Sequence, residues 1–533
     1  MRETRGPPLE SLWLYALAGA LLLGSPVWRY LYVNHYPFSR PEAILLPLGV
    51  ALLGAAIAVI GRRVGGLAGT LSFGALCFGF VDLQLDLDRW IPTAVVGLGC
   101  VALMGLLRTR RALITCLMLA AFDLSSLPRS SLGPSDLKLA ARSAAPPATA
   151  PPLLVHLVLD EQWGIGGLRA AGDSGTADFL GDFYRDRGFE VYEGAYSRSD
   201  LTRESIPEVL SLGRAVVNAE PASPDGSLAN GFRVSVNPYF ERLRDLGYSI
   251  RVFQTSYLDY CHPVGIVVAS CVTMPGNSIA SIGYLSGSWT QRAVLAGRYF
   301  LNLNSHVYLR LKRPPDGALW RRASTGYGLA ELALVRDAIA ARPPPGTAFF
   351  VHVLLPHRPF RVDANCRTLE DLDEAARYEA SKHLSDRSWR AQLGLYGEQD
   401  RCVHRAVNEL LAVLDRTVGR DGAVVIIHGD HGSRIHQNPP GYVPTSEFDA
   451  HQLNSNFSTL LAIRRPQVQG ATFVEAVPIQ EFLWALVGRN FQGRITEAWP
   501  TMVRAAQLDL TRAVTGSPRN LEESDILWAP KPP

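Results

Sequence analysis

The sequence predicts a helical membrane anchor followed by an α/β domain, with a mainly parallel central sheet covered by helices on both faces. Three observations predict this class. The first quarter of the chain carries long apolar runs, each of about the length that crosses a bilayer. From residue 153 onward, helical and strand-like stretches alternate and are joined by short glycine-marked segments. Polar residues that carry chemistry directly follow several of these strands, where α/β proteins bind ligands. We therefore expect an anchor at 1–127, a linker at 128–152 and a domain at 153–533.

Five apolar runs make up the predicted anchor: 12–33, 43–61, 66–83, 91–107 and a shorter one at about 112–127. Arginines gather on alternate connections between these runs, beginning with Arg2 and Arg5 and continuing with Arg62 and Arg63. The positive-inside rule makes those connections cytoplasmic, and five crossings then place the domain outside the cytoplasm. If the short fifth run only lay at the membrane surface, the domain would face the cytoplasm instead.

Composition narrows the class of partner and the compartment. The net charge is only +3, and no basic patch interleaved with aromatic residues is present, so a nucleic-acid partner is not expected. The linker at 128–152 is rich in proline and alanine and lacks periodicity. The four cysteines of the polar remainder form two plausible disulfides in an oxidising compartment, Cys261 with Cys271 and Cys366 with Cys402. Four buried thiols are the alternative if the domain faces the cytoplasm.

The domain begins with a strand-like run and continues with helix-then-strand repeats. The expected strands are 153–159, 189–192, 248–253, 348–355, 423–427 and 457–463, and the expected helices are 177–187, 239–246, 329–341, 403–418 and 479–487. The run at 423–427 is apolar throughout and rich in β-branched residues, which is typical of a strand buried on both faces.

The strand at 423–427 leads into Gly429, Asp430, His431 and Gly432. A carboxylate beside an imidazole suits a metal ion, and the glycines let the backbone turn sharply enough to aim both side chains at it. Taken alone, the same stretch is equally compatible with a polar turn after a core strand. Partners for these side chains elsewhere in the chain favour the metal site.

Two further strands also end in polar residues. The strand 153–159 runs into Asp160 and Glu161, adjacent carboxylates that repel each other unless a cation neutralises them. The strand 348–355 is followed by His357, which two prolines hold in an extended turn. The alternative for Asp160 and Glu161 is a solvated turn, and the alternative for His357 is a structural role.

A hydroxyl-rich segment follows the strand 189–192 and has the pattern of a helix start. The hydroxyl of Thr202 there lies among unpaired backbone N–H groups, which can hold phosphate oxygens. Simple helix capping, with Thr202 facing Ser205, is the alternative. His156 and His352 lie inside predicted strands, and we expect them to be structural.

Together these stretches resemble the alkaline phosphatase/sulfatase superfamily, in particular its membrane-anchored branch of lipoteichoic-acid synthases and lipid A phosphoethanolamine transferases. The resemblance implies one divalent metal ion, with zinc or manganese the best match to mixed carboxylate and imidazole ligands. Its T-x-x-S-x-P setting maps the nucleophile onto Thr202 and the substrate-side histidine onto His357. The metal ligands that it implies are Asp160, Glu161, Asp430 and His431.

The resemblance also implies a reaction. A phospho-alcohol head group passes from a membrane phospholipid to an envelope glycan or lipid through a phospho-threonine intermediate, on the extracytoplasmic side of a bacterial-type inner membrane. His357 assists the leaving or entering alcohol, and the expected substrate contacts are Arg434, His436 and Ser205, with His451 as a further candidate. A phosphodiesterase or phosphatase that uses water, and a non-catalytic envelope assembly protein, are the alternatives. No Cys-x-Pro-x-Arg motif lies near Thr202, which argues against sulfate-ester hydrolysis.

Overall fold

The computed structural model describes chiefly residues 9–83, 95–102 and 150–495, with longer gaps at 214–218, 222–230, 306–316, 368–385 and 436–449 and several shorter ones. Most of the predicted runs at 91–107 and 112–127, and nearly all of the linker, lie outside the described residues. The chain divides into two compact units. The membrane unit comprises Met1–Gly133 and Asn277–Gly326, and the α/β unit comprises Pro134–Gly276 and Tyr327–Pro533.

Three apolar helices open the membrane unit: α1 (Leu9–Val33), α2 (Pro41–Val64) and α3 (Gly66–Asp82). Leu12–Val33 and Pro41–Val64 are long and apolar enough to cross a membrane, whereas the apolar part of α3 is shorter. The backbones of α1 and α2 meet at Gly19 and Gly54, where a Cβ on Gly19 would lie 2.2 Å from the carbonyl oxygen of Gly54. Glycine therefore permits this close packing, as is common between membrane helices.

A segment from the middle of the chain also belongs to the membrane unit. It contains the 3₁₀ helix η2 (Ile279–Tyr284) and α10 (Trp289–Asn304). Arg292 of α10 pairs with the buried Glu42 at the start of α2, with Nη2 donating to Oε2 at 3.2 Å. The hydroxyl of Tyr36 donates to the other oxygen of Glu42 at 3.0 Å. This segment therefore folds with the apolar helices, although the sequence pattern placed it within a continuous domain at 153–533.

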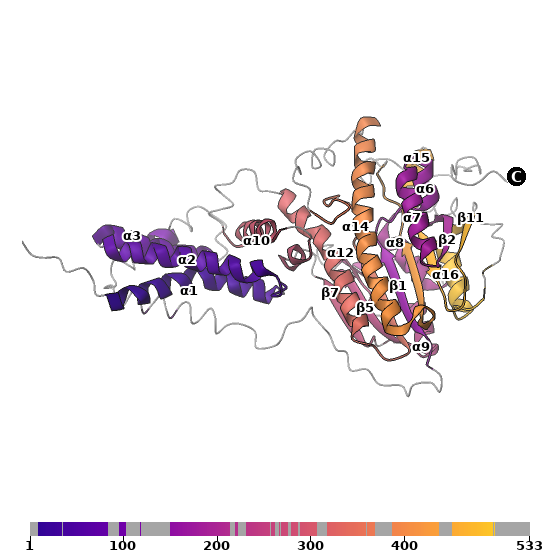
Figure 1. Ribbon diagram of the computed structural model, residues 1–533, viewed down its shortest axis with the longest axis horizontal. Helices are drawn as coiled ribbons and strands as arrows, with labels where there is room; N and C mark the ends of the chain where they lie inside the picture. Colours follow the sequence, from indigo (N-terminus) through magenta and orange to yellow (C-terminus); the bar gives the residue numbers. More distant parts are fainter. Residues whose placement is uncertain are drawn as a thin grey trace, which may run out of the picture. The chain divides into compact units, whose positions relative to one another are not determined.

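The α/β unit is built on an eight-stranded sheet with the order β11-β2-β10-β9-β1-β8-β5-β7 (Figure 1). Only β10 runs antiparallel to its neighbours; the other described pairings in this sheet are parallel. The predicted mainly parallel sheet is thus confirmed. Its strands are β1 (Leu153–Leu159), β2 (Glu190–Tyr196), β5 (Ser249–Thr255), β7 (Ser270–Met274), β8 (Thr347–Val353), β9 (Ala423–Gly429), β10 (Leu461–Arg464) and β11 (Ala471–Pro478).

The central part of the sheet is covered on both faces, as shown by the burial of every residue of the strands β1, β8 and β9. One face packs in a single apolar cluster against α8, α9 and α16, and Figure 1 shows the long helices α12 and α14 running across the sheet. The helices are α6 (Ile165–Ala170), α7 (Ser174–Asp186), α8 (Thr202–Ser211), α9 (Pro238–Asp245), α12 (Gly317–Ala340), α14 (Asp386–Val418), α15 (Ala450–Phe457) and α16 (Ile479–Gly488); the 3₁₀ helix η3 (Arg420–Gly422) precedes β9, and a small sheet joins β3 (Glu220–Pro221), β4 (Phe232–Arg233) and β6 (Leu258–Asp259).

The sequence prediction misplaced some elements. β11 was not predicted, because it is an edge strand whose residues are partly exposed and do not form an apolar run. The expected strand at 457–463 is instead the end of α15 at Phe457 followed by β10. α12 and α14 begin well before the expected 329 and 403, since their first turns lack a strong apolar pattern.

Candidate metal centre

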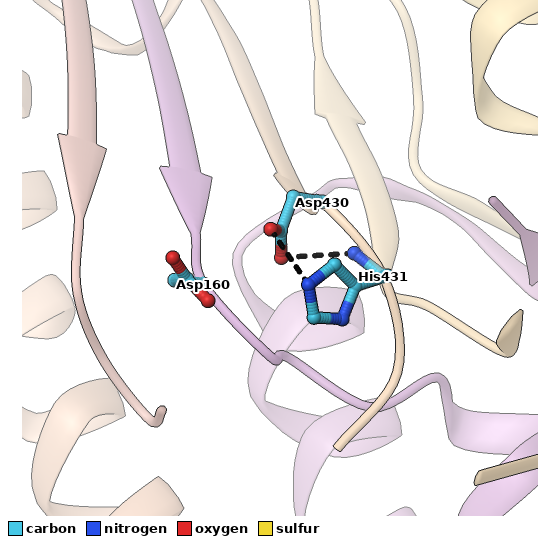
Figure 2. Close-up of side chains that lie close together, drawn as sticks. All are labelled: Asp160, Asp430 and His431. Carbon is cyan, nitrogen blue, oxygen red and sulfur yellow. Dashed lines mark hydrogen bonds and ion pairs between the residues drawn. The ribbon is translucent and has the colours of Figure 1, made fainter. Parts of the chain in front are cut away.

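The register of the central strands brings the predicted ligands together. Leu159, the last residue of β1, pairs with Gly429, the last residue of β9, in parallel register. The next residues, Asp160 and Asp430, therefore leave the sheet at the same edge. Asp160, Asp430 and His431 each offer one atom within 4.8 Å of the others, and Figure 2 shows the three side chains converging there. The expected convergence of these residues is present in the structure.

The carboxylates of this cluster suit a cation. Asp160 and Asp430 are buried, and neither oxygen of Asp160 has a hydrogen bond among the described residues. Oδ1 of Asp430 accepts from the backbone N–H groups of Glu161 and His431, and Oδ2 lies 3.2 Å from Nε2 of His431. An ionised carboxylate taken out of water without donors is costly unless a cation compensates it. Two carboxylates and an imidazole form a ligand set that zinc or manganese accepts. The residues present thus fit one divalent ion.

The two carboxylates have opposite pKa shifts. Burial, and then the neighbouring Asp430, raise the pKa of Asp160 to about 7. Burial acts on Asp430 in the same direction, but the neighbouring His431 and His352 rings and the hydrogen bond from the backbone N–H of Glu161 outweigh it, so the pKa of Asp430 lies below its ordinary value. Like charges at this distance oppose joint ionisation. Near neutral pH, the site without an ion therefore retains part of one proton.

Thr202 lies against the cluster. Its Oγ1 is 3.2 Å from Nε2 of His431, and Nδ1 of His431 is 2.9 Å from the carbonyl oxygen of Gly432. Because a carbonyl only accepts, Nδ1 of His431 carries a hydrogen, and Nε2 is the ring nitrogen that faces Thr202. Thr202 is the first residue of α8, whose N-cap is Leu201, so the Thr202 side chain is turned to the site and does not cap the helix.

Glu161 is not part of the three-residue cluster, although the resemblance implied that it binds the metal. Arg434 binds its carboxylate, with Nε donating to Oε1 at 2.9 Å, and the backbone N–H of Arg358 donates to Oε2 at 3.1 Å. Burial alone would raise the pKa of Glu161, but the charges of His357, Arg434 and Arg358 lower it well below its usual range. Arg434, expected to bind phosphate, thus pairs with Glu161 in this structure.

His357 is the most accessible of the predicted catalytic residues. Its side chain is 28% exposed, and Nε2 lies 3.5 Å from Oε1 of Glu161. Nδ1 faces the carbonyl oxygen of Arg358, which orients the ring. Ser205 is fully buried on α8, and its hydroxyl has no partner among the described residues. His436 and the side chain of His451 lie outside the described residues.

His352 was expected to be structural, but it lies beside the metal cluster. Its Nε2 is 3.4 Å from Oδ2 of Asp160, and its Nδ1 is 2.8 Å from the hydroxyl of Tyr260. Burial lowers the pKa of His352 to about 4, so the ring is neutral at physiological pH. With Tyr260 donating to Nδ1, the Nε2 hydrogen lies on the side of Asp160, although no hydrogen bond joins the two in this structure. The sequence of β8, whose residues are all buried, contains no signal that distinguishes His352 from a core residue.

A second buried chain supports the end of β9. His428 Nδ1 lies 2.7 Å from the carbonyl oxygen of Gly429, His156 Nε2 lies 2.8 Å from His428 Nε2, and Tyr239 Oη lies 2.8 Å from His156 Nδ1. The carbonyl fixes the hydrogen of His428 on Nδ1. His156 then donates from Nε2 and accepts from Tyr239, so every donor and acceptor of the chain is assigned. This chain holds the Gly429 peptide that carries Asp430.

Both predicted disulfides are present. Cys261 is bonded to Cys271, and Cys366 is bonded to Cys402, with sequence separations of 10 and 36 residues. Among the described cysteines, Cys77 and Cys100 of the membrane unit are free.

Neither a protein-family model nor a curated protein sequence matches the chain. Solved structures that it resembles include the C-terminal periplasmic domain of EcEptC from Escherichia coli in complex with Zn, at 12% identity and a TM-score of 0.37, covering 63% of this chain and 81% of that one. The phosphonate monoester hydrolase of Agrobacterium radiobacter matches at 15% identity and a TM-score of 0.40, covering 63% and 73%. A protein described as a sulfatase from Bacteroides thetaiotaomicron matches at 12% identity and a TM-score of 0.39, covering 66% and 76%.

These three proteins belong to the superfamily that the sequence motifs resemble. Scores of this size show what the chain is similar to and assign it no activity. The chemistry of this chain follows from its own side chains.

Proposed function

We propose that this chain is a membrane-anchored, metal-dependent phosphotransferase that moves a phospho-alcohol head group from a membrane phospholipid to an envelope glycan or lipid. One observation carries the proposal. A buried set of two carboxylates and an imidazole, in which neither oxygen of Asp160 has a hydrogen bond among the described residues, lies directly beside the hydroxyl of Thr202. A divalent ion would compensate these buried charges and would lie beside a hydroxyl that can act as a nucleophile.

Asp160, Asp430 and His431 hold the divalent ion in this proposal. Such an ion, when bound, lowers the pKa of a nearby hydroxyl and neutralises charge on a phosphoryl oxygen. Ligation by His431 uses the Nε2 lone pair that faces Thr202, because Nδ1 is committed to the Gly432 carbonyl. The neutral ring of His352 lies beside Asp160, and the chain from Tyr239 to His428 keeps the Gly429 peptide in place.

Thr202 is the nucleophile in the proposed first step. Its Oγ1 loses the hydroxyl proton to water and forms a bond to phosphorus, while the bond from phosphorus to the lipid alcohol breaks. His357 gives a proton to the departing lipid alcohol. In the second step His357 takes a proton from the acceptor hydroxyl, whose oxygen bonds to phosphorus as the bond to Thr202 breaks, and Oγ1 of Thr202 regains a proton from water. The exposure of His357 suits a group that exchanges protons with both alcohols.

Two features support an extracytoplasmic site. The α/β unit contains two disulfides, which persist in oxidising compartments. The membrane unit contains two helices long and apolar enough to cross a bilayer, and a lipid donor is confined to that surface. We therefore place the reaction on the outer side of a bacterial-type inner membrane, with the five-crossing anchor as part of the proposal.

The test uses the full chain in lipid nanodiscs that contain phospholipid labelled in its head group. Two readouts are taken: released diacylglycerol, and mass spectrometry of the peptide that carries Thr202. We expect a phosphorylated peptide with the head group attached, and Thr202→Ala should lower turnover by at least about 10³-fold with the metal content unchanged. Thr202→Ser should retain part of the activity, since it keeps a hydroxyl at the same position.

Ser211→Ala is the matched control on the same helix, because the hydroxyl of Ser211 is bonded to the backbone of Glu208 within α8. It should behave as the unmodified protein does. Label that appears only as free head-group phosphate would identify a hydrolase that uses water. Full turnover in Thr202→Ala would remove Thr202 as the nucleophile.

A further inference from the structure

Gln399 of α14 binds the backbone of the turn that carries His357. Its side chain is fully buried, and it bonds to the chain on both sides of the histidine. Nε2 donates to the carbonyl oxygens of Pro356 and His357 at 2.9 Å and 3.1 Å. Oε1 accepts from the backbone N–H of Arg361 at 2.8 Å. One side chain of a long helix therefore holds the peptide of a proposed catalytic residue.

The amide of Gln399 fits this place in one orientation. A carbonyl oxygen only accepts and a backbone N–H only donates. Exchanging Oε1 and Nε2 would place the amide nitrogen against the N–H of Arg361 and the amide oxygen against two carbonyl oxygens, so the hydrogen-bond partners fix the assignment. Loss of the amide would leave backbone groups of the turn without partners, which costs free energy where they are buried.

Two further contacts of α14 hold the far end of the same turn. Oε2 of Glu398 accepts from the backbone N–H of Ala364 at 2.9 Å, and Cys402 is bonded to Cys366 through the longer disulfide. Both attach to the chain at least seven residues after His357. Among the described contacts of α14, those of Gln399 are thus the ones that reach the His357 peptide itself.

The ring of His357 depends on this peptide for its position. Nδ1 faces the carbonyl oxygen of the next residue, Arg358, so the ring is oriented by its own turn. Nε2 then lies 3.5 Å from Oε1 of Glu161, the residue that directly follows Asp160. A shift of the turn would carry the ring with it. Because a displacement of about 1 Å from reactive geometry can cost about 10²-fold in rate, the anchor of the turn matters for proton transfer.

We infer that Gln399 is a positioning residue for the proton transfers of His357. The inference rests on the proposed function, in which His357 gives a proton to the departing lipid alcohol. Gln399 does not touch the substrate in this account. It acts through the two carbonyl oxygens and the N–H that it holds around His357.

The test compares two leaving groups in the first turnover of the full chain in nanodiscs. Release of diacylglycerol from the lipid needs a proton, whereas release of p-nitrophenolate from bis(p-nitrophenyl) phosphate does not. Gln399→Met keeps the volume of the side chain and removes its hydrogen bonds. We expect it to slow diacylglycerol release about 10²-fold and not to slow p-nitrophenolate release. His357→Ala should show the same selectivity, and Gln399→Met should add nothing to it in the double variant.

Asn408→Ala is the matched control, because it removes an amide from the same helix that accepts from Arg187 at 3.0 Å and does not contact the turn. It should release both leaving groups as the unmodified protein does. Gln399→Glu is a second variant in case Gln399→Met does not fold. It keeps an acceptor for the N–H of Arg361 but cannot donate to the two carbonyl oxygens when ionised, so the same selectivity is expected. Equal slowing of both leaving groups would indicate a purely structural role and would overturn the inference.

Amide hydrogen exchange of the peptide that contains residues 356–366 gives a readout that does not depend on turnover. Exchange in this peptide should be faster in Gln399→Met than in Asn408→Ala. If the unmodified protein released neither leaving group, the proposed function would fail, and the exchange rates would still show whether Gln399 holds the turn. Equal exchange in the two variants would rule out Gln399 as the anchor of His357.

Discussion

Arg434 and Glu161 form a buried ion pair in which both residues have left-handed backbone conformations, with φ of 53° and 58°. Residues other than glycine rarely adopt this region, and such strain persists where the surrounding structure enforces it, often at functional sites. Glu161 follows Asp160 directly, and Arg434 lies in the turn that carries Asp430 and His431. The pair therefore ties the turn after β1 to the turn after β9.

Glu161→Gln should destabilise the α/β unit without removing the metal. Loss of the carboxylate charge leaves Arg434 without its ion pair, and breaking a buried pair costs about 3–5 kcal/mol. Elemental analysis should find the metal content unchanged, while urea unfolding reports the lost stability. Asp160→Asn, in contrast, should lower the metal content measured by elemental analysis. If Glu161→Gln loses the metal as fully as Asp160→Asn does, Glu161 is a ligand, as the resemblance implied.

Metal binding should release a proton below neutral pH. The pKa of Asp160 is raised from 3.8 to about 7 in the folded protein without an ion. The raised pKa of Asp160 therefore adds to the free energy of unfolding of the metal-free protein at acidic pH. This stabilisation is lost as the pH rises from about 4 through 7. Because the ion needs the carboxylate ionised, its affinity should rise up to about pH 7 and then level off.

Isothermal titration of Zn²⁺ in buffers of different ionisation enthalpy measures this release. We expect nearly one proton per ion at pH 6 and much less at pH 8. Asp160→Asn should abolish the difference. Equal proton release at both pH values would show that Asp160 is ionised without the ion.

Arg292→Met should destabilise the membrane unit. Arg292 pairs with Glu42, whose side chain is fully buried, so the substitution leaves a buried carboxylate without the cation that neutralises it, at a cost of about 3–5 kcal/mol. The double variant Glu42→Gln/Arg292→Met should recover most of this loss, as measured by thermal unfolding in detergent. Arg298→Gln, at an exposed position of α10, is the control. A single variant as stable as the unmodified protein would show that the segment at 277–326 is not held by this pair.

Each disulfide should stabilise the α/β unit. Cys261→Ser and Cys366→Ser should each lower the free energy of unfolding by about 2–4 kcal/mol, with the larger effect for the longer loop in the chain-entropy model. Mass spectrometry of unreduced, alkylated peptides checks the pairing itself. Four alkylated cysteines would contradict both the pairing and the extracytoplasmic placement of the domain.

The sequence alone determined the mainly parallel sheet and most of the candidate metal centre. Apolar runs that end in polar residues identify strand ends, and parallel strands end at one edge of a sheet. Asp160, Asp430 and His431 were therefore found without any knowledge of their distances. Thr202 was identified by the resemblance of its T-x-x-S-x-P setting to the superfamily, because a hydroxyl at a predicted helix start is by itself explained by helix capping.

Only the tertiary structure decided which partner each of the remaining charged groups takes. Glu161 binds Arg434, which is 273 residues away, and His352 faces Asp160 from a neighbouring strand. The structure also places the segment at 277–326 with the apolar helices through Glu42 and Arg292. Local sequence patterns indicate periodicity and burial. They do not indicate whether a given carboxylate will pair with an arginine, pair with a histidine or bind a metal ion. The relative positions of distant segments select among them, and these positions arise only when the chain is folded.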